Sequence, residues 1–325
     1  MSTIQKAMGK IRHPLVEDQK AKDEQAALEK LAAENALEEE ASKAVAKKAA
    51  EHVAKKKRAT HKPPKLIELD VDELSDQGMV GPIHDGASKL INDEFRAIKH
   101  KIIKNAFGEN SDLNNNSDLI MVTSSKPNEG KTFVSINLAM SIALEKDKTV
   151  LLIDADVLKP SVSKVLGIGS DRPGLIEYLL GEVDDISEVI YPTSVPNLRL
   201  IPAGMPNHLS YELLSSDRMI ALTKELAERY DDRILLFDCP PILGVVETVV
   251  LSSLMGQAMV VVEQDKTRVG DIKAAVSQLN NDLILGFIVN KVVRGTFTQQ
   301  GYGYGYASYG LGYGYGYNAE AEPSK

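Results

Sequence analysis

The sequence has no tryptophan, a single cysteine and no long apolar run among its 325 residues. One cysteine, Cys239, excludes a disulfide within the chain and is typical of a reducing compartment. No segment approaches the roughly 18–20 consecutive apolar residues of a membrane-spanning helix. The N-terminus also lacks the apolar stretch and small-residue cleavage site of a signal peptide. These absences predict a cytoplasmic protein that reaches a membrane only through a partner.

An excess of positive charge is missing as well. The chain has 46 acidic residues against 38 Lys and Arg, which gives a formal net charge of −8. Because the phosphate backbone of nucleic acid is bound by basic surfaces, this balance argues against nucleic acid as the main partner. The six histidines show no spacing typical of metal ligands, so no zinc site is expected.

The composition divides the chain into four regions. Residues 1–58 are rich in Ala, Glu and Lys, which predicts a charged arm that is helical or disordered. Residues 59–88 contain several Pro and Gly and predict a linker. Residues 89–297 carry most of the apolar pattern and predict one folded domain, and residues 298–325 predict a flexible tail rich in Tyr and Gly.

Within the predicted domain, short apolar runs alternate with helical patterns. Strands are expected at 119–123, 149–154, 198–202, 233–238, 258–262 and 285–290. Helices are expected from residue 89 onward and at 132–144, 210–228 and 270–280. Strands made of continuous Val, Ile and Leu are buried on both faces, so the pattern predicts an α/β fold with a mostly parallel sheet and helices on both faces.

The stretch SSKPNEGKTF follows the first predicted strand and opens a helix. This is the place of a phosphate-binding P-loop, in which backbone N–H groups at a helix start surround an anion. Lys131 would add a positive charge for the outer phosphates, and the Thr132 hydroxyl would bind Mg²⁺. The first glycine of the usual pattern is replaced by Ser125, but the strand–loop–helix context favours a nucleotide site over a chance turn. The candidate cofactor-binding residues are Lys126, Pro127, Asn128, Glu129, Gly130, Lys131, Thr132 and Phe133.

Two further stretches, LLIDADVLKPS and ILLFDCPP, place Asp154, Asp156 and Asp238 at the ends of strands. Ligands bind at the carboxyl edge of parallel sheets, so these acids should meet the phosphates and their Mg²⁺. The simpler alternative is that Asp154 and Asp238 cap helices. Lys131 and the three acids are the predicted catalytic residues, and Thr132, Asp156 and Asp238 are the predicted metal ligands.

A late strand ends in Asn290, whose amide either binds the purine or belongs to a simple turn. The C-terminal stretch GYGYGYASYGLGYGYGY holds seven of the chain's 11 tyrosines. Alone, it is typical of a Gly–Tyr interaction segment. Beside a nucleotide site it predicts phosphate acceptors, because a phenol with a pKa near 10 needs a carboxylate base to become nucleophilic. The predicted acceptors are Tyr302, Tyr304, Tyr306, Tyr309, Tyr313, Tyr315 and Tyr317.

The three stretches SSKPNEGKTF, LLIDADVLKPS and ILLFDCPP, followed by a tyrosine cluster, resemble the bacterial tyrosine kinases of exopolysaccharide synthesis. That family calls them Walker A, Walker A′ and Walker B, and the likeness covers about residues 90–317. The opening MSTIQKAMGKI is similar to the stand-alone kinases found with exosortase-type loci. The resemblance implies a P-loop NTPase fold, ATP with Mg²⁺, and autophosphorylation of the tail within an oligomer. It also implies a membrane-embedded chain-length regulator as activator, a cognate phosphatase, and a place on the inner membrane through that partner.

This sequence departs from the family pattern at two places. The arginine that closes many Walker A′ motifs is Leu158 here, and the oligomerisation motif E-x-x-R-x-x-R is replaced by Asp93, Arg96 and Lys99. Loss of the forked guanidinium at Lys99 weakens the expectation of ring assembly. Lys126 also matches an extra loop lysine of the related positioning and partitioning ATPases, which reaches across a dimer. The alternatives to a kinase are therefore a positioning ATPase, or a nucleotide-bound scaffold with a Gly–Tyr interaction tail.

Overall fold

The structure is a computed structural model that describes residues 64–83, 85–108, 116–169, 171–207, 210–229 and 232–293. The predicted arm at 1–58 lies outside these residues. So does the tail at 298–325, together with all seven predicted acceptors. The boundaries of those two regions therefore remain predictions.

The described residues form a seven-stranded sheet with the order β3-β4-β2-β5-β1-β6-β7. Every neighbouring pair is parallel except β3 and β4. The strands are β1 Leu119–Ser124, β2 Thr149–Asp154, β3 Tyr191–Pro192, β4 Leu198–Ile201, β5 Arg233–Asp238, β6 Gln257–Glu263 and β7 Ile284–Asn290. The sequence predicted six of these seven to within two residues at either end. It missed β3, which has only two residues and therefore shows no periodicity.

Burial along the strands follows their position in the sheet. β1 and β5 lie at the centre and are buried at every residue, as continuous apolar runs predict. β7 lies at the edge, and its residues alternate between half-buried and exposed. The expectation of a mostly parallel α/β sheet is confirmed, but β7 is covered less than its apolar sequence suggests.

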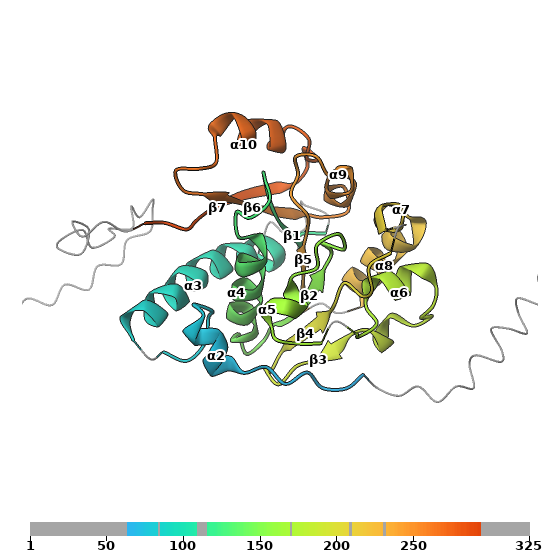
Figure 1. Ribbon diagram of the computed structural model, residues 1–325, viewed down its shortest axis with the longest axis horizontal. Coiled ribbons are helices and arrows are strands. Elements are labelled where there is room, and N and C mark those ends of the chain that lie inside the picture. Colours follow the sequence, from blue (N-terminus) through green and yellow to red (C-terminus); the bar gives the residue numbers. More distant parts are fainter. Residues whose placement is uncertain are drawn as a thin grey trace, which may run out of the picture. The chain divides into compact units, whose positions relative to one another are not determined.

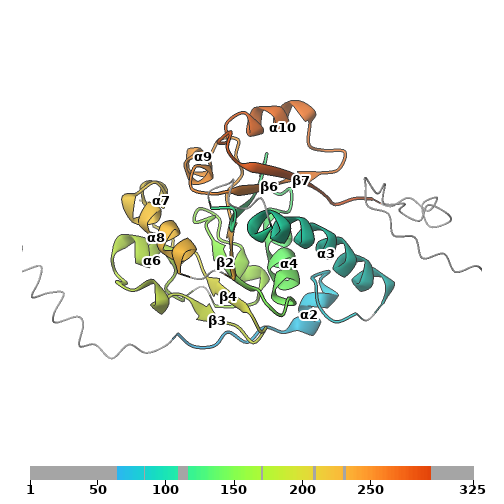
Figure 2. The same ribbon diagram turned by 180° about the vertical axis from the view of Figure 1, so that it is seen from behind.

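Helices lie on both sides of this sheet (Figure 1). α3 and α4 lie on one side, and α8 and α9 lie on the other, as the view from behind also shows (Figure 2). The helices are α2 Val71–Asp76, α3 Gly86–Phe107, α4 Lys131–Ala143, α5 Val162–Val165, α6 Leu175–Leu180, α7 Ser210–Leu214, α8 Asp217–Glu228, α9 Val246–Ser252 and α10 Val269–Val276, with a 3₁₀ turn at Ile186–Glu188.

Capping residues explain where two helices depart from prediction. α3 starts three residues early because Asp85 and Ser88 form a capping box, each side chain accepting from the other's backbone N–H. The single helix expected at 210–228 is divided into α7 and α8. The division falls at Ser216, whose hydroxyl accepts from Met219 N (3.3 Å) and caps α8.

The segment predicted as a linker differs from that expectation over its described residues. Ile67, Leu69, Leu74 and Val80 are buried in the core of the domain. Ile67 bridges to Thr193 beside β3, and its N–H donates to Pro192 O (2.9 Å). The Pro and Gly residues at 64–82 therefore shape a segment that packs on the domain, and the folded unit includes residues from 64 onward.

Candidate active site

The P-loop connects the end of β1 to the start of α4, as predicted. α4 begins at Lys131, and the N-cap residue before it, Gly130, has no side chain that could cap the helix. The N–H groups of this first turn therefore have no partner within the helix and are directed toward the loop. Together with the helix dipole they favour an anion such as a phosphate group.

Only glycine fits at position 130. Its φ of +96° lies in the left-handed region, which side chains other than glycine rarely adopt. A Cβ at this position would also overlap the Asn290 amide nitrogen. The backbone of the loop is thus pressed directly against the end of β7.

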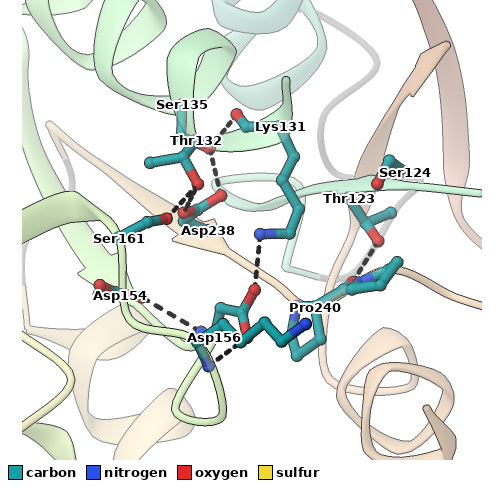
Figure 3. A network of polar contacts seen from close by, with 12 residues as sticks. Thr123, Ser124, Lys131, Thr132, Ser135, Asp154, Asp156, Ser161, Asp238 and Pro240 are labelled. Carbon is teal, nitrogen blue, oxygen red and sulfur yellow. Dashed lines mark hydrogen bonds and ion pairs between the residues drawn. The ribbon is translucent and has the colours of Figure 1, made fainter. Parts of the chain in front are cut away.

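Five side chains converge at the inner side of the P-loop (Figure 3). Lys131 Nζ lies 2.6 Å from Asp156 Oδ2. The Thr132 hydroxyl donates to Asp238 Oδ2 (2.7 Å), and the Ser135 hydroxyl donates to Asp238 Oδ1 (2.9 Å). The structure therefore brings the predicted lysine and threonine into contact with two of the three predicted acids, which arrive from β2 and β5.

The third acid, Asp154, lies in the same group, but both of its carboxylate oxygens accept hydrogen bonds from backbone N–H groups that follow it within eight residues. Oδ1 accepts from Asp156 N and Oδ2 accepts from Val162 N, both at 3.2 Å. Val162 is the first residue of α5, so Asp154 holds a helix start. For Asp154 the capping alternative describes the observed contacts, whereas Asp238 accepts from side chains and caps no helix.

Burial controls the electrostatics of this group. Asp154 and Asp238 are fully buried, and Asp156 nearly so. Burial and the neighbouring charge of Asp238 raise the pKa of Asp154 well above its ordinary value. Burial also raises the pKa of Asp238, against the effect of Lys131 and of two hydroxyl donors. For Lys131, burial lowers the pKa, but attraction to Asp238 and Asp156 outweighs it and leaves the pKa raised.

Three carboxylates with one lysine leave a local excess of negative charge, which a divalent cation would compensate. No group of three or more His, Cys, Asp or Glu is arranged as a complete metal site in the described ranges. Mg²⁺ typically uses one or two carboxylates and completes its coordination with phosphate oxygens and water. The pair Asp156 and Asp238, with the Thr132 hydroxyl, fits a cation of this kind.

The outer side of the P-loop is held by residues that the sequence did not predict. The buried Glu129 carboxylate accepts from Lys126 N (2.9 Å) and from the Thr267 hydroxyl. Lys126 Nζ forms an ion pair with Asp271 at 2.5 Å. Lys291 Nζ donates to Asn128 O (2.7 Å).

A fourth contact comes from Asn290, whose amide donates to Glu129 O (2.9 Å). We call Thr267, Asp271, Asn290 and Lys291 the β6–β7 clamp, because the first two follow β6 and the last two lie at the end of β7 and directly after it. Asn290 was predicted to contact a purine or to form a turn, and the observed role of its amide is to hold the loop. No local motif marks the clamp, since its members lie more than 130 positions from the loop.

The remaining predicted binding residues occupy different places. The Phe133 side chain packs edge-on against Phe95 of α3, with ring centroids 6.4 Å apart. It is therefore directed into the helix layer. Ser161 was not predicted, yet its hydroxyl lies 2.7 Å from the Thr132 hydroxyl. Its position directly before α5, as the last residue of LLIDADVLKPS, was the available signal.

The positions that resemble an oligomerisation motif do not behave alike. Lys99 is buried and donates to Ser141 O (3.1 Å), and its Nζ lies 2.6 Å from Glu145. This lysine therefore joins α3 to the end of α4. Asp93 and Arg96 line a surface pocket beside the same helix end, and the buried Lys99 lines it as well.

None of the helices in the described part of the chain combines the length and the apolar character that a membrane span requires. Tyr178 and Tyr191 are buried in the core. Neither of them is placed to receive a phosphate.

Comparison with known proteins agrees with this geometry. An AAA-domain family model matches residues 117–277. The tyrosine-protein kinase Ptk of Acinetobacter johnsonii is 34% identical over 182 residues, which are 55% of this chain and 24% of Ptk. The tyrosine-protein kinase Wzc of Salmonella typhimurium is 32% identical over 188 residues, 57% of this chain and 26% of Wzc. The chain thus spans about a quarter of the length of these relatives.

The fold comparison finds a similar kinase domain. The kinase domain of the Escherichia coli tyrosine kinase Etk is similar with a TM-score of 0.53 and 26% identity, covering 66% of this chain and 80% of that domain. The described domain is an α/β P-loop NTPase fold, and the chain is homologous to the bacterial tyrosine kinases that its three sequence motifs resemble.

Proposed function

We propose that this chain is an ATP- and Mg²⁺-dependent protein-tyrosine kinase whose acceptors lie in its own C-terminal tyrosine cluster. The observation that carries the proposal is the meeting of Lys131 and Thr132 with Asp156 and Asp238 at the P-loop. This arrangement occurs in a domain homologous to tyrosine kinase domains. The acceptors would be Tyr302, Tyr304, Tyr306, Tyr309, Tyr313, Tyr315 and Tyr317.

Bound MgATP would supply the phosphoryl group and neutralise the excess negative charge of the acids. Thr132, Asp156 and Asp238 would hold the cation. Lys131 now pairs with Asp156, and a phosphate oxygen is an equivalent anionic partner for its ammonium group. Exchange of Asp156 for phosphate would align the phosphates along the start of α4.

The same exchange points to the base. Asp154 and Asp238 already accept hydrogen bonds at both oxygens. Asp156 Oδ1 accepts from Lys159 N (3.2 Å), while Oδ2 lies 2.6 Å from Lys131 Nζ. Once Lys131 turns to phosphate, Asp156 Oδ2 would be available for the phenolic proton, and Oδ1 would be the oxygen that holds the cation. We therefore assign the base to Asp156, with transfer in trans within an oligomer.

The wider setting follows from the resemblance. The kinase would regulate polymerisation or export of an exopolysaccharide, at the inner membrane and through a membrane-embedded chain-length regulator. A cognate phosphatase would reverse the modification. Since Lys99 is used inside the domain, self-assembly through α3 would depend on Asp93 and Arg96.

The test is incubation of the full chain with γ-labelled ATP and Mg²⁺, followed by mapping of the label. We expect label on tail tyrosines and its loss in Lys131→Met. Mixing Lys131→Met with an active chain that ends at residue 297 tests transfer in trans. Label on the inactive partner's tail is the expected result, and its absence would contradict transfer between chains.

The same assay separates the alternatives. Release of free phosphate without labelled tyrosine would favour a positioning ATPase, and neither product would favour a scaffold. A positioning ATPase of this type needs Lys126 to reach across a dimer. In the structure that lysine is paired with Asp271 of its own chain, which favours the kinase.

A further inference from the structure

Strand β7 is the outer strand of the sheet, and no other strand of the described residues pairs with its far side (Figure 1). Its apolar side chains are unevenly covered. Leu285, Phe287 and Val289 are 38%, 53% and 56% exposed, whereas the residues between them are half-buried. We call these three side chains the β7 row. It is continued by the exposed Val292 and Val293.

The backbone of the β7 row faces outward as well. Ile284 N donates to Gly256 O (3.0 Å), and Asn290 O accepts from Gln264 N (3.0 Å). The backbone groups of even-numbered residues therefore face β6. Because successive residues of a strand direct these groups to opposite sides, the β7 row directs its N–H and C=O groups to the free edge.

Such an edge is normally protected in proteins. Charged side chains, proline, bulges or a covering segment keep exposed edge strands from pairing with other chains. The β7 sequence ILGFIVN contains no charge and no proline. An apolar row with unpaired backbone groups thus has the features of a surface that another strand covers.

The chain itself continues from this edge, with 32 residues after Val293. In the stretch from Tyr309 to Tyr317, every odd position is Tyr or Leu and every even position is Gly. A period of two is the pattern of a β-strand, with one aromatic face and one bare face. The stretch has nine residues, and β7 has seven.

We propose that residues 309–317 pair antiparallel with the free edge of β7 in the same chain, with their tyrosines beside the β7 row. Residues opposite each other in an antiparallel pair have side chains on the same face, so the aromatic face and the β7 row coincide. Aromatic side chains opposite aromatic or β-branched ones are favourable cross-strand pairs. The intervening residues 291–308 are numerous enough to reverse the chain direction, since an extended residue spans about 3.4 Å.

This pairing does not require kinase activity, but its regulation rests on the proposed function. A phosphate group adds about −1.5 to −2 charges to a tyrosine. Placed beside the apolar β7 row, that charge would lose hydration without gaining a partner. Phosphorylation would therefore release the strand, and the paired form would hold unmodified acceptors.

Hydrogen exchange of the full chain without nucleotide tests the pairing, after phosphatase treatment confirmed by mass. The reporters are the amides of Leu285, Phe287 and Val289. We expect them to exchange about tenfold more slowly than in a chain that ends at residue 300, a difference equal to about 1.4 kcal/mol. Equal exchange in the two chains would overturn the proposal.

A composition-matched variant sharpens the test. Gly312→Tyr with Tyr313→Gly, and Gly316→Tyr with Tyr317→Gly, keep the length and the number of tyrosines but break the period of two. We expect this variant to exchange as fast as the shortened chain. Slow exchange in this variant would contradict the formation of a strand by residues 309–317. If the slowing in the full chain instead grew with protein concentration, the pairing would be between two copies, and the proposed pairing within one chain would be overturned.

Substitution on β7 provides the reciprocal test. Phe287→Ser should speed exchange at Leu285 and Val289. Ile220→Ser on α8 removes a side chain of similar exposure, 48%, from another surface and should leave both amides unchanged. Equal effects of the two substitutions would count against the pairing. These exchange measurements contain no nucleotide. A negative result would therefore reject the strand pairing without bearing on the kinase activity, which the phosphorylation assay tests separately.

Discussion

The two sides of the P-loop are held by contacts of different kinds. On the inner side, Lys131 and Thr132 contact Asp156 and Asp238, which are almost completely buried. On the outer side, Lys126 pairs with Asp271 where both side chains are partly exposed. Water screens the outer pair, whereas the inner one lies in a medium of low dielectric constant.

This difference indicates a division of roles. Removing one partner of a buried ion pair typically costs about 3–5 kcal/mol because the other charge stays buried without compensation. The inner side is therefore suited to charge stabilisation during phosphoryl transfer. The β6–β7 clamp holds the P-loop in position through several separate hydrogen bonds. Removing any one of them leaves the others in place, so we expect smaller effects on this side.

The largest expected effect comes from Asp238→Asn. The amide keeps the shape and one acceptor for Thr132 or Ser135, but it removes a buried negative charge. We expect tail phosphorylation to fall at least about 100-fold, the scale of a lost electrostatic contribution to the transition state. Thermal stability should stay equal or rise, since burial raises the pKa of this acid and disfavours its charge. Phosphorylation within a few fold of the wild type would contradict its assignment.

On the outer side, Glu129→Gln should have the next largest effect. The carboxylate accepts from Lys126 N and Thr267, and an amide nitrogen would face one of these donors. Loss of a charge-assisted hydrogen bond corresponds to about 1.5–3 kcal/mol. We expect the nucleotide Kd from calorimetry to rise about tenfold or more, while the rate of phosphorylation at saturating ATP changes little. If the affinity for nucleotide and the rate at saturating ATP fell by the same factor, Glu129 would belong with the residues of the inner side that act in phosphoryl transfer.

Thr267→Val should be weaker than Glu129→Gln. It removes the hydroxyl that donates to Glu129 and keeps the β-branched shape. This is one of the two hydrogen bonds that the carboxylate accepts, and the one from Lys126 N remains, so Kd should rise by only a few fold. Thr267→Ser keeps the hydroxyl and is the matched control. A change in Thr267→Ser as large as in Thr267→Val would show that packing, not the hydrogen bond, matters here.

The smallest effect is expected for Asp271→Asn. The hydrogen bond from Lys126 lowers the pKa of Asp271 below its ordinary value of 3.8. A lowered carboxyl pKa stabilises the folded state above that ordinary value, and the contribution is lost as the pH falls through the lowered pKa. The difference in melting temperature between wild type and Asp271→Asn should thus be small at neutral pH, decrease with salt and close below about pH 4. A difference that grows in acid would contradict the ion pair.

Local patterns predicted the centre of the fold well. β1, β2 and β5 read as continuous apolar runs because they are buried on both faces, and the acids that follow β2 and β5 share one edge because the strands are parallel. The P-loop was predictable for a similar reason, since its residues are consecutive. The contact of Lys131 with Asp156 and of Thr132 with Asp238 follows from this topology.

Contacts between distant segments were not predictable. Residues 64–83 contain the Pro and Gly of a linker, yet Ile67 and Val80 are buried by surfaces formed elsewhere. Lys99 matches an assembly motif by position, but its ammonium group caps the carbonyl end of α4. In both cases local composition was the same as for an exposed segment.

By itself, the sequence determined the six longer strands, the phosphate-binding loop and the identity of the acids around it, because each depends on neighbouring residues and on the period of burial. Only the tertiary structure decided that Asp154 holds α5 while Asp238 holds Thr132 and Ser135. It alone decided that Asn290 and Thr267 fasten the P-loop and that β7 keeps an apolar edge exposed. The physical reason is that a side chain's partner and its access to water depend on which remote segments pack beside it.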